Sequence, residues 1–305
     1  MNKNTLKENV RLFLEHLSSD KKIAANTVCA YTNDIAKFLH FVEKSGVTKW
    51  SAVDTKFIEH YLNKIKKDMS KASVKRNIAS LKKLYKYLYE RKLIEKRDFR
   101  KIGYFKNELQ SYPEVLTVRE VKLMTDAAKG RGFLGVRDKA MLLFLYSVGA
   151  KASEVCVVKV SDLDLKNHLF IYRNHIGKRE VPFCEELIPF LKDYLKARKR
   201  ILAKLEKKDS GYLFLNRSGD KLTRQSIYLL VKKYAKESDI NKKVTPCTLR
   251  HSVTSHLFFF GNADLDEMKR IFGYITTPLV LKNTMLPEEY TYFVYLKKHP
   301  LFKHR

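Results

Sequence analysis

The segment "VTPCTLRHSVTSHL", residues 244–257, carries an arginine and two histidines on one predicted helix. Arg250 and His251 are adjacent, and His256 follows five positions later, with apolar residues recurring around them at helical spacing. An arginine fork can bind two phosphate oxygens at once, and a histidine can donate or accept a proton near neutral pH. The segment therefore predicts either an active-site helix that binds a phosphate or a basic helix whose polar side chains face water.

The charge of the chain predicts a polyanionic partner. The 305 residues include 61 Lys and Arg against 33 Asp and Glu, which gives a formal net charge of +28. A folded chain with this excess repels itself unless polyanions are nearby, so nucleic acid is the expected partner. The alternative is a lysine-rich composition without a binding role.

The four cysteines and the apolar runs exclude several other classes of protein. Cys29, Cys156, Cys184 and Cys247 lie far apart and form no Cys-x-x-Cys pair, so neither a zinc finger nor a disulfide framework is expected. No run reaches the length of a membrane span, and the first ten residues lack the apolar core of a signal peptide. The expected location is the cytoplasm, with DNA and without contact to a membrane.

The apolar periodicity predicts a small helical domain in residues 1–102. Four segments show helical spacing, and four amphipathic helices with short connections can form such a domain. The predicted helix starts are Leu6, the capping pair Asn26–Thr27, Asp54 and Ser70.

A mixed domain is predicted over residues 116–305, after a linker at 103–115 that has no apolar period. Two of its expected strands flank a turn at Gly177, which is the pattern of a hairpin. The predicted strands are 168–174, 179–183 and 211–216, and the predicted helices are 137–148, 185–208, 223–235, 245–260, 264–272 and 287–296. The expected fold class is therefore mostly α with a small β-sheet (α+β).

The last helix of the first domain is unusually basic. Residues 71–101 hold twelve Lys or Arg against three acids. A solvated helix face normally mixes both signs, so this bias favours a helix that follows a phosphate backbone over one that is basic only for solubility. The predicted DNA-binding residues on it are Lys71, Lys75, Arg76, Lys82 and Lys83.

Four segments, in this order, resemble the tyrosine recombinase (phage integrase) family and especially its Xer branch. They are "PEVLTVREVKLM", "RDKAMLLFLYSVGAKASEVCVVKVSDLDL", "TPCTLRHSVTSHLFFFGNADLDEMKRIFGY" and "NTMLPEEYTYFVYLKKHP". The resemblance spans nearly the whole chain. It implies a helical, SAM-like core-binding domain and a mixed catalytic-type domain that close around double-stranded DNA as a C-shaped clamp.

The family's chemistry needs a defined set of side chains. Two arginines bind the scissile phosphate, a hairpin lysine protonates the departing 5′ oxygen, and two further groups support the phosphate and the nucleophile. A tyrosine attacks and forms a 3′-phosphotyrosyl link, so the resemblance implies no metal and no other cofactor.

Of these six positions, the sequence keeps only Arg250. The first arginine, in the family's Gly-Leu-Arg-x-Ser-Glu stretch, is Lys151 here, which preserves a charge but not a bidentate fork. The other substituted positions are His175 (or Asn174 in a second alignment of the turn) for the lysine, Cys247 for the first histidine, Tyr274 for the later histidine and Asn283 for the tyrosine. An amide cannot form the covalent intermediate, so the resemblance implies a fold that binds DNA without cutting it.

The alignment at Asn283 decides this interpretation. Thr284 follows it as in the family, and the family's His-Pro ending falls on His299–Pro300 without a gap. The tyrosines downstream of Asn283 have helical spacing, which indicates that they are packing residues. The candidates for a displaced nucleophile are nevertheless Tyr290, Tyr292 and Tyr295.

Three functions follow from the sequence. The first is a duplex-DNA-binding family member that has lost strand cleavage and acts as an accessory or regulatory subunit, with Arg250 and Lys151 at the phosphate and with His251 and His256 in structural roles. The second is an active site-specific recombinase with an atypical active site. The third is a basic RNA-binding module, although no aromatic–basic strand motif is visible. The predicted helix 287–296 allows a homo-oligomer or a partner recombinase without requiring either.

Overall fold

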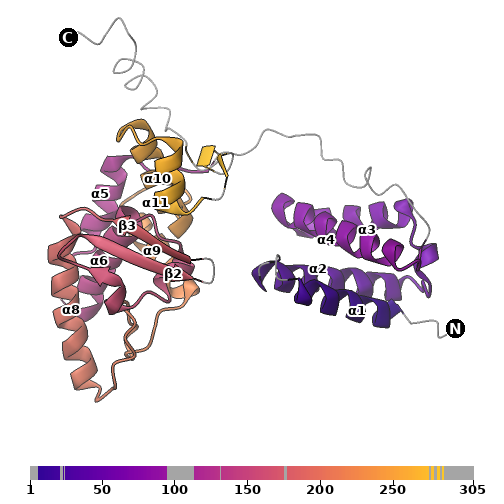
Figure 1. The fold of residues 1–305 in the computed structure, drawn as a ribbon, viewed down its shortest axis with the longest axis horizontal. Helices are drawn as coiled ribbons and strands as arrows, with labels where there is room; N and C mark the ends of the chain where they lie inside the picture. Colours follow the sequence, from indigo (N-terminus) through magenta and orange to yellow (C-terminus); the bar gives the residue numbers. More distant parts are fainter. Residues whose placement is uncertain are drawn as a thin grey trace, which may run out of the picture. The chain divides into compact units, whose positions relative to one another are not determined.

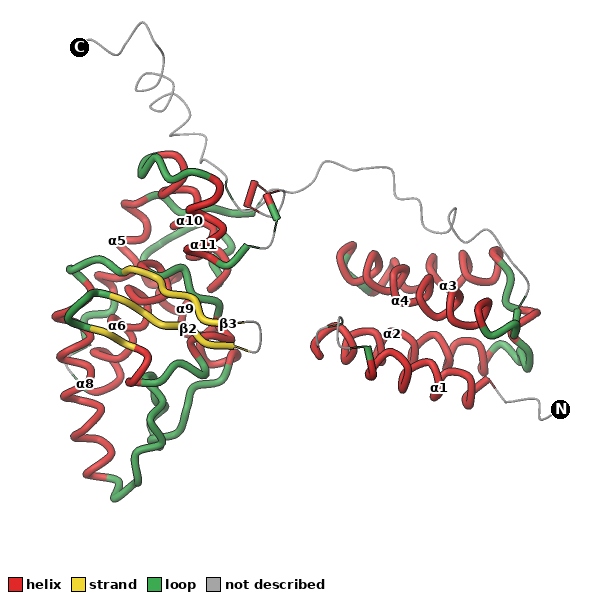
Figure 2. Tube along the Cα trace, in the orientation of Figure 1, coloured by secondary structure: helices red, strands yellow, loops and turns green. Residues whose placement is uncertain are grey.

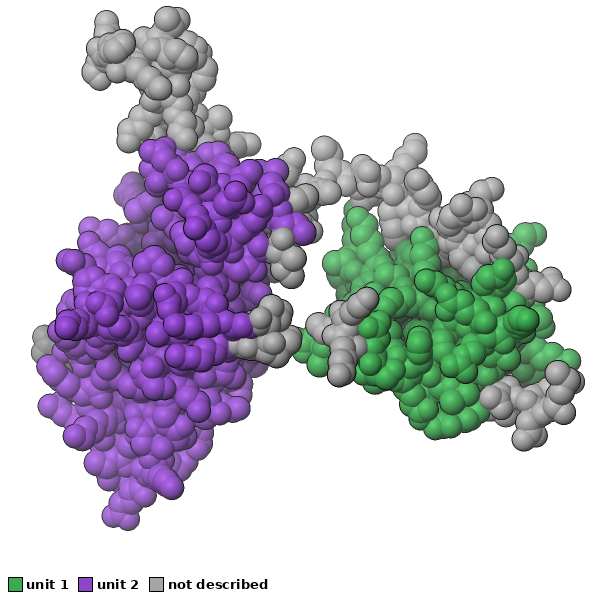
Figure 3. Space-filling model, viewed as in Figure 1, with its two compact units in different colours: residues 1–110 green, residues 111–305 purple. Residues whose placement is uncertain are grey.

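The computed structural model describes residues 6–20, 23, 25–94, 113–130, 132–174, 177–274, 276–277, 280–281 and 284. The chain divides into two units, residues 1–110 and 111–305, which Figure 3 colours separately. The division falls inside the range predicted as a linker, of which residues 103–112 lie outside the described part.

The described part of unit 1 is a bundle of four α-helices (Figures 1 and 2). Its elements are α1 (Leu6–Ser19), α2 (Ala25–Lys44), the short 3-10 helix η1 (Trp50–Ala52), α3 (Thr55–Asp68) and α4 (Lys71–Glu90). Asp54 and Ser70 cap α3 and α4 as predicted, because each side chain accepts a hydrogen bond from the backbone N–H three residues on. The predicted cap of α2 is wrong, since this helix begins at Ala25 and takes Asn26–Thr27 into its first turn.

The core of unit 1 is rich in aromatic side chains. Phe38 stacks against Trp50 with ring centroids 6.5 Å apart, and Tyr61 meets Phe38 edge-on at 5.0 Å. Trp50 is the only tryptophan of the chain, and it is buried. Its fluorescence therefore reports the folding of unit 1 alone.

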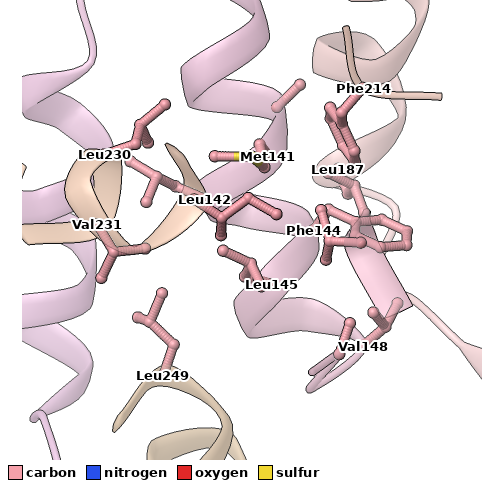
Figure 4. Close-up of a cluster of buried hydrophobic side chains, with 14 of the residues drawn as sticks. Met141, Leu142, Phe144, Leu145, Val148, Leu187, Phe214, Leu230, Val231 and Leu249 are labelled. Carbon is pink, nitrogen blue, oxygen red and sulfur yellow. The ribbon is translucent and has the colours of Figure 1, made fainter. Parts of the chain in front are cut away.

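The helix α6 (Phe133–Ser147) forms the centre of unit 2. It is apolar on nearly all sides, as the sequence predicts for a buried helix. In Figure 4 its side chains meet Val231 of α9 and Leu249 of α10. The other described helices of unit 2 are α5 (Val118–Ala127), α7 (Ala152–Val155), α8 (Leu187–Lys204), α9 (Arg224–Glu237), α10 (Pro246–Phe259) and α11 (Leu265–Phe272). Because Leu249 is held in this core, the residue that follows it has a fixed position.

A three-stranded antiparallel sheet covers one side of unit 2. Its strands are β1 (Leu163–Asp164), β2 (Leu169–Asn174) and β3 (Gly177–Pro182), in the order β1-β2-β3. The predicted hairpin is confirmed, and its register pairs Tyr172 with Arg179. With the helices, this sheet confirms the expected fold class.

The strand predicted at 211–216 is wrong. The segment makes only two isolated bridges among the described residues, Lys159 with Tyr212 and Leu215 with Lys221. Side chains bind part of its backbone instead: the Tyr194 hydroxyl donates to the Leu213 carbonyl and accepts from the Leu215 N–H, both at 2.9 Å. The Leu213 carbonyl and the Leu215 N–H are therefore not available for pairing with a neighbouring strand, although the apolar alternation of the segment is typical of a strand.

Three helices of unit 2 begin next to the residues at which the sequence predicts their starts. Thr223, Thr245 and Asp264 each accept a backbone hydrogen bond at the start of α9, α10 and α11. The helix predicted at 287–296 lies outside the described residues. None of the described helices is long and apolar enough to cross a membrane.

Candidate phosphate-binding site

The first turn of α10 is built to hold Arg250 one turn into the helix. Thr245 accepts a hydrogen bond from the Thr248 N–H at 3.2 Å, and the Thr248 hydroxyl accepts from the Thr245 N–H at 3.1 Å. Pro246 fills the first helical position, where no N–H is needed. This reciprocal cap fixes the direction in which the helix enters the core.

Arg250 is buried, with 5% of its surface exposed, and its guanidinium is bound to backbone carbonyls. Nη1 donates to the Gly149 oxygen at 2.5 Å, and Nη2 donates to the Phe272 oxygen at 2.6 Å. The guanidinium carbon also lies 4.9 Å from the centre of the Tyr274 ring. Among the described residues it has no carboxylate partner, and three of its five N–H groups have no acceptor there.

Gly149 is required for this arrangement. Its φ of +57° lies in the left-handed region, and a Cβ added there would come within 2.3 Å of the Phe272 ring. The close approach brings the end of α6 against the end of α11, and it aims the Gly149 carbonyl at Arg250.

The turn after Gly149 presents Lys151 to solvent. Lys151 is the N-cap of the short helix α7, and its backbone N–H donates to the carboxylate of Glu154 at 3.0 Å. Glu154 is itself buried, with 2% of its surface exposed. The exposed Lys151 side chain thus starts two residues from the Gly149 carbonyl to which Arg250 donates.

A second guanidinium, from the sheet, donates to the Phe272 carbonyl that Arg250 also binds. Arg179 on β3 donates from Nη1 to the Phe272 oxygen at 3.0 Å and from Nη2 to Glu154 at 3.1 Å. The elements α10, α11 and β3 therefore come together at the end of α11 (Figure 1). The exposed Lys151, the buried Arg250 and the half-buried Arg179, with a single carboxylate among them, form a site with an excess of positive charge.

A second basic surface lies on α4 of unit 1. We name it the α4 basic face and define it as Lys71, Lys75, Lys82, Lys83 and Lys86, all of which are exposed. Spacings of four and seven residues place most of them along one side of the helix, opposite its buried residues. Lys86 lies 3.7 Å from Glu90, whereas Lys82 and Lys83 make no ion pair with any described residue.

Arg76, on the same helix, is used differently from the prediction. Its Nε and Nη2 donate to the two carboxylate oxygens of Asp34 at 2.8 and 3.0 Å, and Asp34 is buried in α2. This bidentate pair joins α4 to α2. The predicted DNA contact of Arg76 is therefore revised to a role in packing, because its fork is already occupied.

Replacing Arg76 with Gln should lower the free energy of unfolding of unit 1 by about 1–3 kcal/mol, because it leaves the Asp34 carboxylate buried without its cation. Urea unfolding followed by Trp50 fluorescence measures this change. Lys82→Gln, on the same helix and without an ion pair, should leave the midpoint unchanged. The assignment fails if Arg76→Gln unfolds like the wild-type protein.

Models of two sequence families match the chain. The model described as "Phage integrase family" matches residues 114–277, more than half of the chain, and "Phage integrase, N-terminal SAM-like domain" matches residues 10–92. The chain belongs to the phage integrase family.

Individual members of this family are similar to nearly the whole chain. The tyrosine recombinase XerC of Thermodesulfovibrio yellowstonii is 33% identical over 295 residues, which are 95% of this chain and 96% of that protein. A putative tyrosine recombinase of Caldanaerobacter subterraneus subsp. tengcongensis is 30% identical over 263 residues, which are 86% and 88% of the two chains. The predicted resemblance to the Xer branch is thereby confirmed.

Solved recombinase structures have the same fold. The XerA recombinase superposes with a TM-score of 0.56 at 25% identity, covering 96% of this chain and 99% of that one. XerH bound to its difH substrate gives a TM-score of 0.70 at 17% identity, with 96% and 90% covered. The predicted fold of a SAM-like domain with a recombinase catalytic-type domain is therefore confirmed.

Three of the six predicted family positions come together in this phage integrase family member. Lys151, Arg250 and Tyr274 all lie around the end of α11, whereas Cys247 is exposed on the first turn of α10. His175 and Asn283 lie outside the described residues, as do the tyrosines at 290, 292 and 295.

Two residues of the site were missed by the sequence reasoning. Glu154 stands in the quoted "GAKASEV" stretch, three positions after Lys151, and could have been found there. Arg179 carries no such signal, because it is one basic residue among 61.

His256 has a structural role, as predicted. It is buried, and its Nδ1 lies 2.7 Å from the hydroxyl of Tyr146 on α6. Burial lowers the pKa of His256 to about 4, with a partly opposing effect of the Leu116 backbone. The ring is therefore neutral at neutral pH and adds no charge to the phosphate site.

Proposed function

We propose that this protein binds duplex DNA as a phage integrase family member that has lost strand cleavage, and that it acts as an accessory or regulatory subunit. The proposal is carried by Asn283, the residue on which the resemblance places the family's tyrosine, nine positions after Tyr274. A carboxamide cannot attack a phosphate to form a phosphotyrosyl link, so the covalent step has no nucleophile.

The environment of Tyr274 supports this proposal. Its hydroxyl lies 3.3 Å from Thr254 Oγ1, its ring faces the Arg250 guanidinium, and only 8% of its surface is exposed. A buried phenol in this position packs against the phosphate-binding arginine and does not present its oxygen to DNA. Tyr274 is thus a poor substitute for the missing nucleophile.

The retained positive charge supports DNA binding. Arg250 keeps unused N–H donors beside the exposed Lys151, and the α4 basic face supplies further cations on the other unit. XerH bound to difH and lambda integrase bound to a Holliday junction have the same fold, from which we infer that double-stranded DNA is the ligand here too.

An active recombinase is the second candidate. It is favoured by the 33% identity to a XerC over nearly the whole chain, which includes both matched domains. A covalent protein–DNA link separates the two candidates, since only the active enzyme forms one.

Changing Lys71, Lys75, Lys82 and Lys83 together to Gln should weaken binding to all duplex sequences alike, because interactions with phosphates carry no sequence information. The slope of log K against log salt should become shallower by about 0.9 for each phosphate that is no longer neutralised. Fluorescence anisotropy of a labelled mixed-sequence duplex, titrated at several salt concentrations, measures both effects. Structured RNA at matched salt should compete poorly, and preferential binding of RNA would favour the third function instead.

A matched control is available on α8. Lys192, Lys196, Lys199 and Lys204 are exposed on that helix, and changing them to Gln removes the same charge. This variant should keep most of the wild-type slope. Equal reductions of affinity in both variants would mean that binding follows net charge only, which contradicts a DNA-binding face on α4.

A further inference from the structure

The phosphate-binding site is held by a closed ring of hydrogen bonds. Arg250 links the Gly149 and Phe272 carbonyls, and Arg179 links the Phe272 carbonyl to Glu154. Glu154 in turn accepts from the Lys151 N–H, two residues from Gly149, which closes the ring along the chain. The ring joins four elements that are distant in sequence: the α6–α7 turn, β3, α10 and the end of α11.

The two guanidinium groups are unusually close for like charges. Both donate to the same Phe272 oxygen, so the donating nitrogens are no further apart than the two hydrogen-bond lengths added together. Only Glu154 supplies negative charge among the described residues of the ring. Such a pair repels unless its geometry is enforced or an anion is bound, so the ring has to hold Arg250 in place against Arg179.

Arg179 has little freedom to take another position. Its guanidinium carbon lies 5.1 Å from the centre of the Tyr172 ring, and its buried Nε has no hydrogen-bond partner among the described residues. A Cβ at Gly273 would come within 2.6 Å of Arg179 Nη1, so this glycine leaves the space that the guanidinium fills. The Arg179 side chain therefore links the β2–β3 hairpin to the turn between α11 and Tyr274.

We propose that Arg179 is a positioning residue for the phosphate-binding site. It acts through its bridge between the Phe272 carbonyl and Glu154, which keeps the Arg250 guanidinium and the Lys151 turn aimed at one phosphate. This rests on the proposed function, in which Arg250 and Lys151 bind DNA. It also couples the β2–β3 hairpin to that phosphate.

A double-mutant cycle of Arg179→Gln and Arg250→Gln tests this role in the full-length protein. Affinity and salt slope are measured on a mixed-sequence duplex, at a temperature where circular dichroism shows that all variants are folded. We expect Arg250→Gln to weaken binding at least about tenfold in the wild-type background and less than about threefold in the Arg179→Gln background. The salt slope should become shallower by about 0.9 in either single variant and no further in the double variant.

Two further variants separate positioning from charge and from stability. Arg179→Lys keeps the charge but lacks the fork that spans the carbonyl and the carboxylate, so it should behave like Arg179→Gln. Arg198 offers a matched control in the same unit, because it is buried and bridges the Tyr212 carbonyl and the Asp209 carboxylate away from the site. Arg198→Gln should lower the free energy of unfolding of unit 2. Any change that it makes in DNA affinity should simply add to the change made by Arg250→Gln.

The outcomes distinguish this proposal from the proposed function. If Arg250→Gln weakens binding and its effect adds to that of Arg179→Gln, then Arg179 has no positioning role and the DNA-binding function stands. Wild-type affinity in Arg179→Lys would likewise overturn the role, because charge alone would then suffice. If the wild-type protein does not bind the duplex at all, the proposed function itself fails.

Discussion

Incubation of the purified protein with nicked duplex DNA should leave no strand covalently attached to it. In an active family member, a nick beside the cleavage site releases a short fragment, so the phosphotyrosyl link cannot reverse and accumulates. A pool of duplexes with nicks in randomised sequence removes the need to know the target site. Labelled DNA that migrates with the protein in a denaturing gel is the measurement.

The expected effect is large because the group that the proposed function lacks is the nucleophile. Removing the nucleophile of an enzyme that works through a covalent intermediate costs on the order of 10⁶ in rate. Lys151 would impair the same step, since a lysine cannot bind two phosphate oxygens as an arginine fork does. Under the proposed function, we therefore expect Asn283 alone to abolish a detectable adduct.

A reverted chain provides the positive control for this assay. It combines Asn283→Tyr with Lys151→Arg, His175→Lys, Cys247→His and Tyr274→His, and it should form an adduct if the fold and the DNA pool are competent. An adduct with the wild-type protein would instead establish the active recombinase. Tyr→Phe changes at positions 290, 292 and 295, made one at a time, would then identify the residue that attacks.

Local signals in the sequence were sufficient for most of the fold. Asp54, Ser70 and Thr223 begin helices where predicted, because a capping side chain binds backbone groups only three residues away. The strand expected at 211–216 failed for the opposite reason. Its alternation is local, but Tyr194 and Arg198, which bind its backbone, belong to α8.

The same distinction explains what the sequence showed of the site. Motif spacing located Arg250 and Lys151, but it could not show that Arg250 is buried between carbonyls 101 and 22 positions away. Arg76 was counted with the DNA-binding lysines because Asp34, its partner, is 42 positions distant. A basic residue that holds the fold and one that holds DNA look alike until the acceptor is known.

Acidification should destabilise unit 2 through His256. The folded-state pKa of about 4 lies below the ordinary value of 6.5, so between these pH values the unfolded chain binds more protons than the folded one. The titration of His256 leaves the free energy of unfolding of unit 2 unchanged above about pH 6.5. As the pH falls from there toward 4, this free energy decreases by about 3 kcal/mol in total. Urea unfolding at a series of pH values measures it.

His256→Gln isolates this contribution, because the variant cannot titrate there. The difference between wild type and variant should grow as the pH falls, in the circular dichroism transition of unit 2. It should be absent from the Trp50 fluorescence transition, which reports unit 1. A pH dependence that is equal in both proteins would show that other groups control the acid response.

Acidification should also weaken DNA binding, which is the opposite of what the charge of the protein alone predicts. Protonation of carboxylates and histidines makes the protein more cationic, which by itself tightens binding to phosphate. However, His256 and Arg250 share α10, and the contact of His256 with Tyr146 anchors that helix to α6. Charging the buried ring loosens the helix that positions the guanidinium, so wild-type affinity should fall below about pH 5 while that of His256→Gln rises or stays level. Tighter binding by the wild-type protein at acid pH would show that α10 remains in place when His256 is protonated.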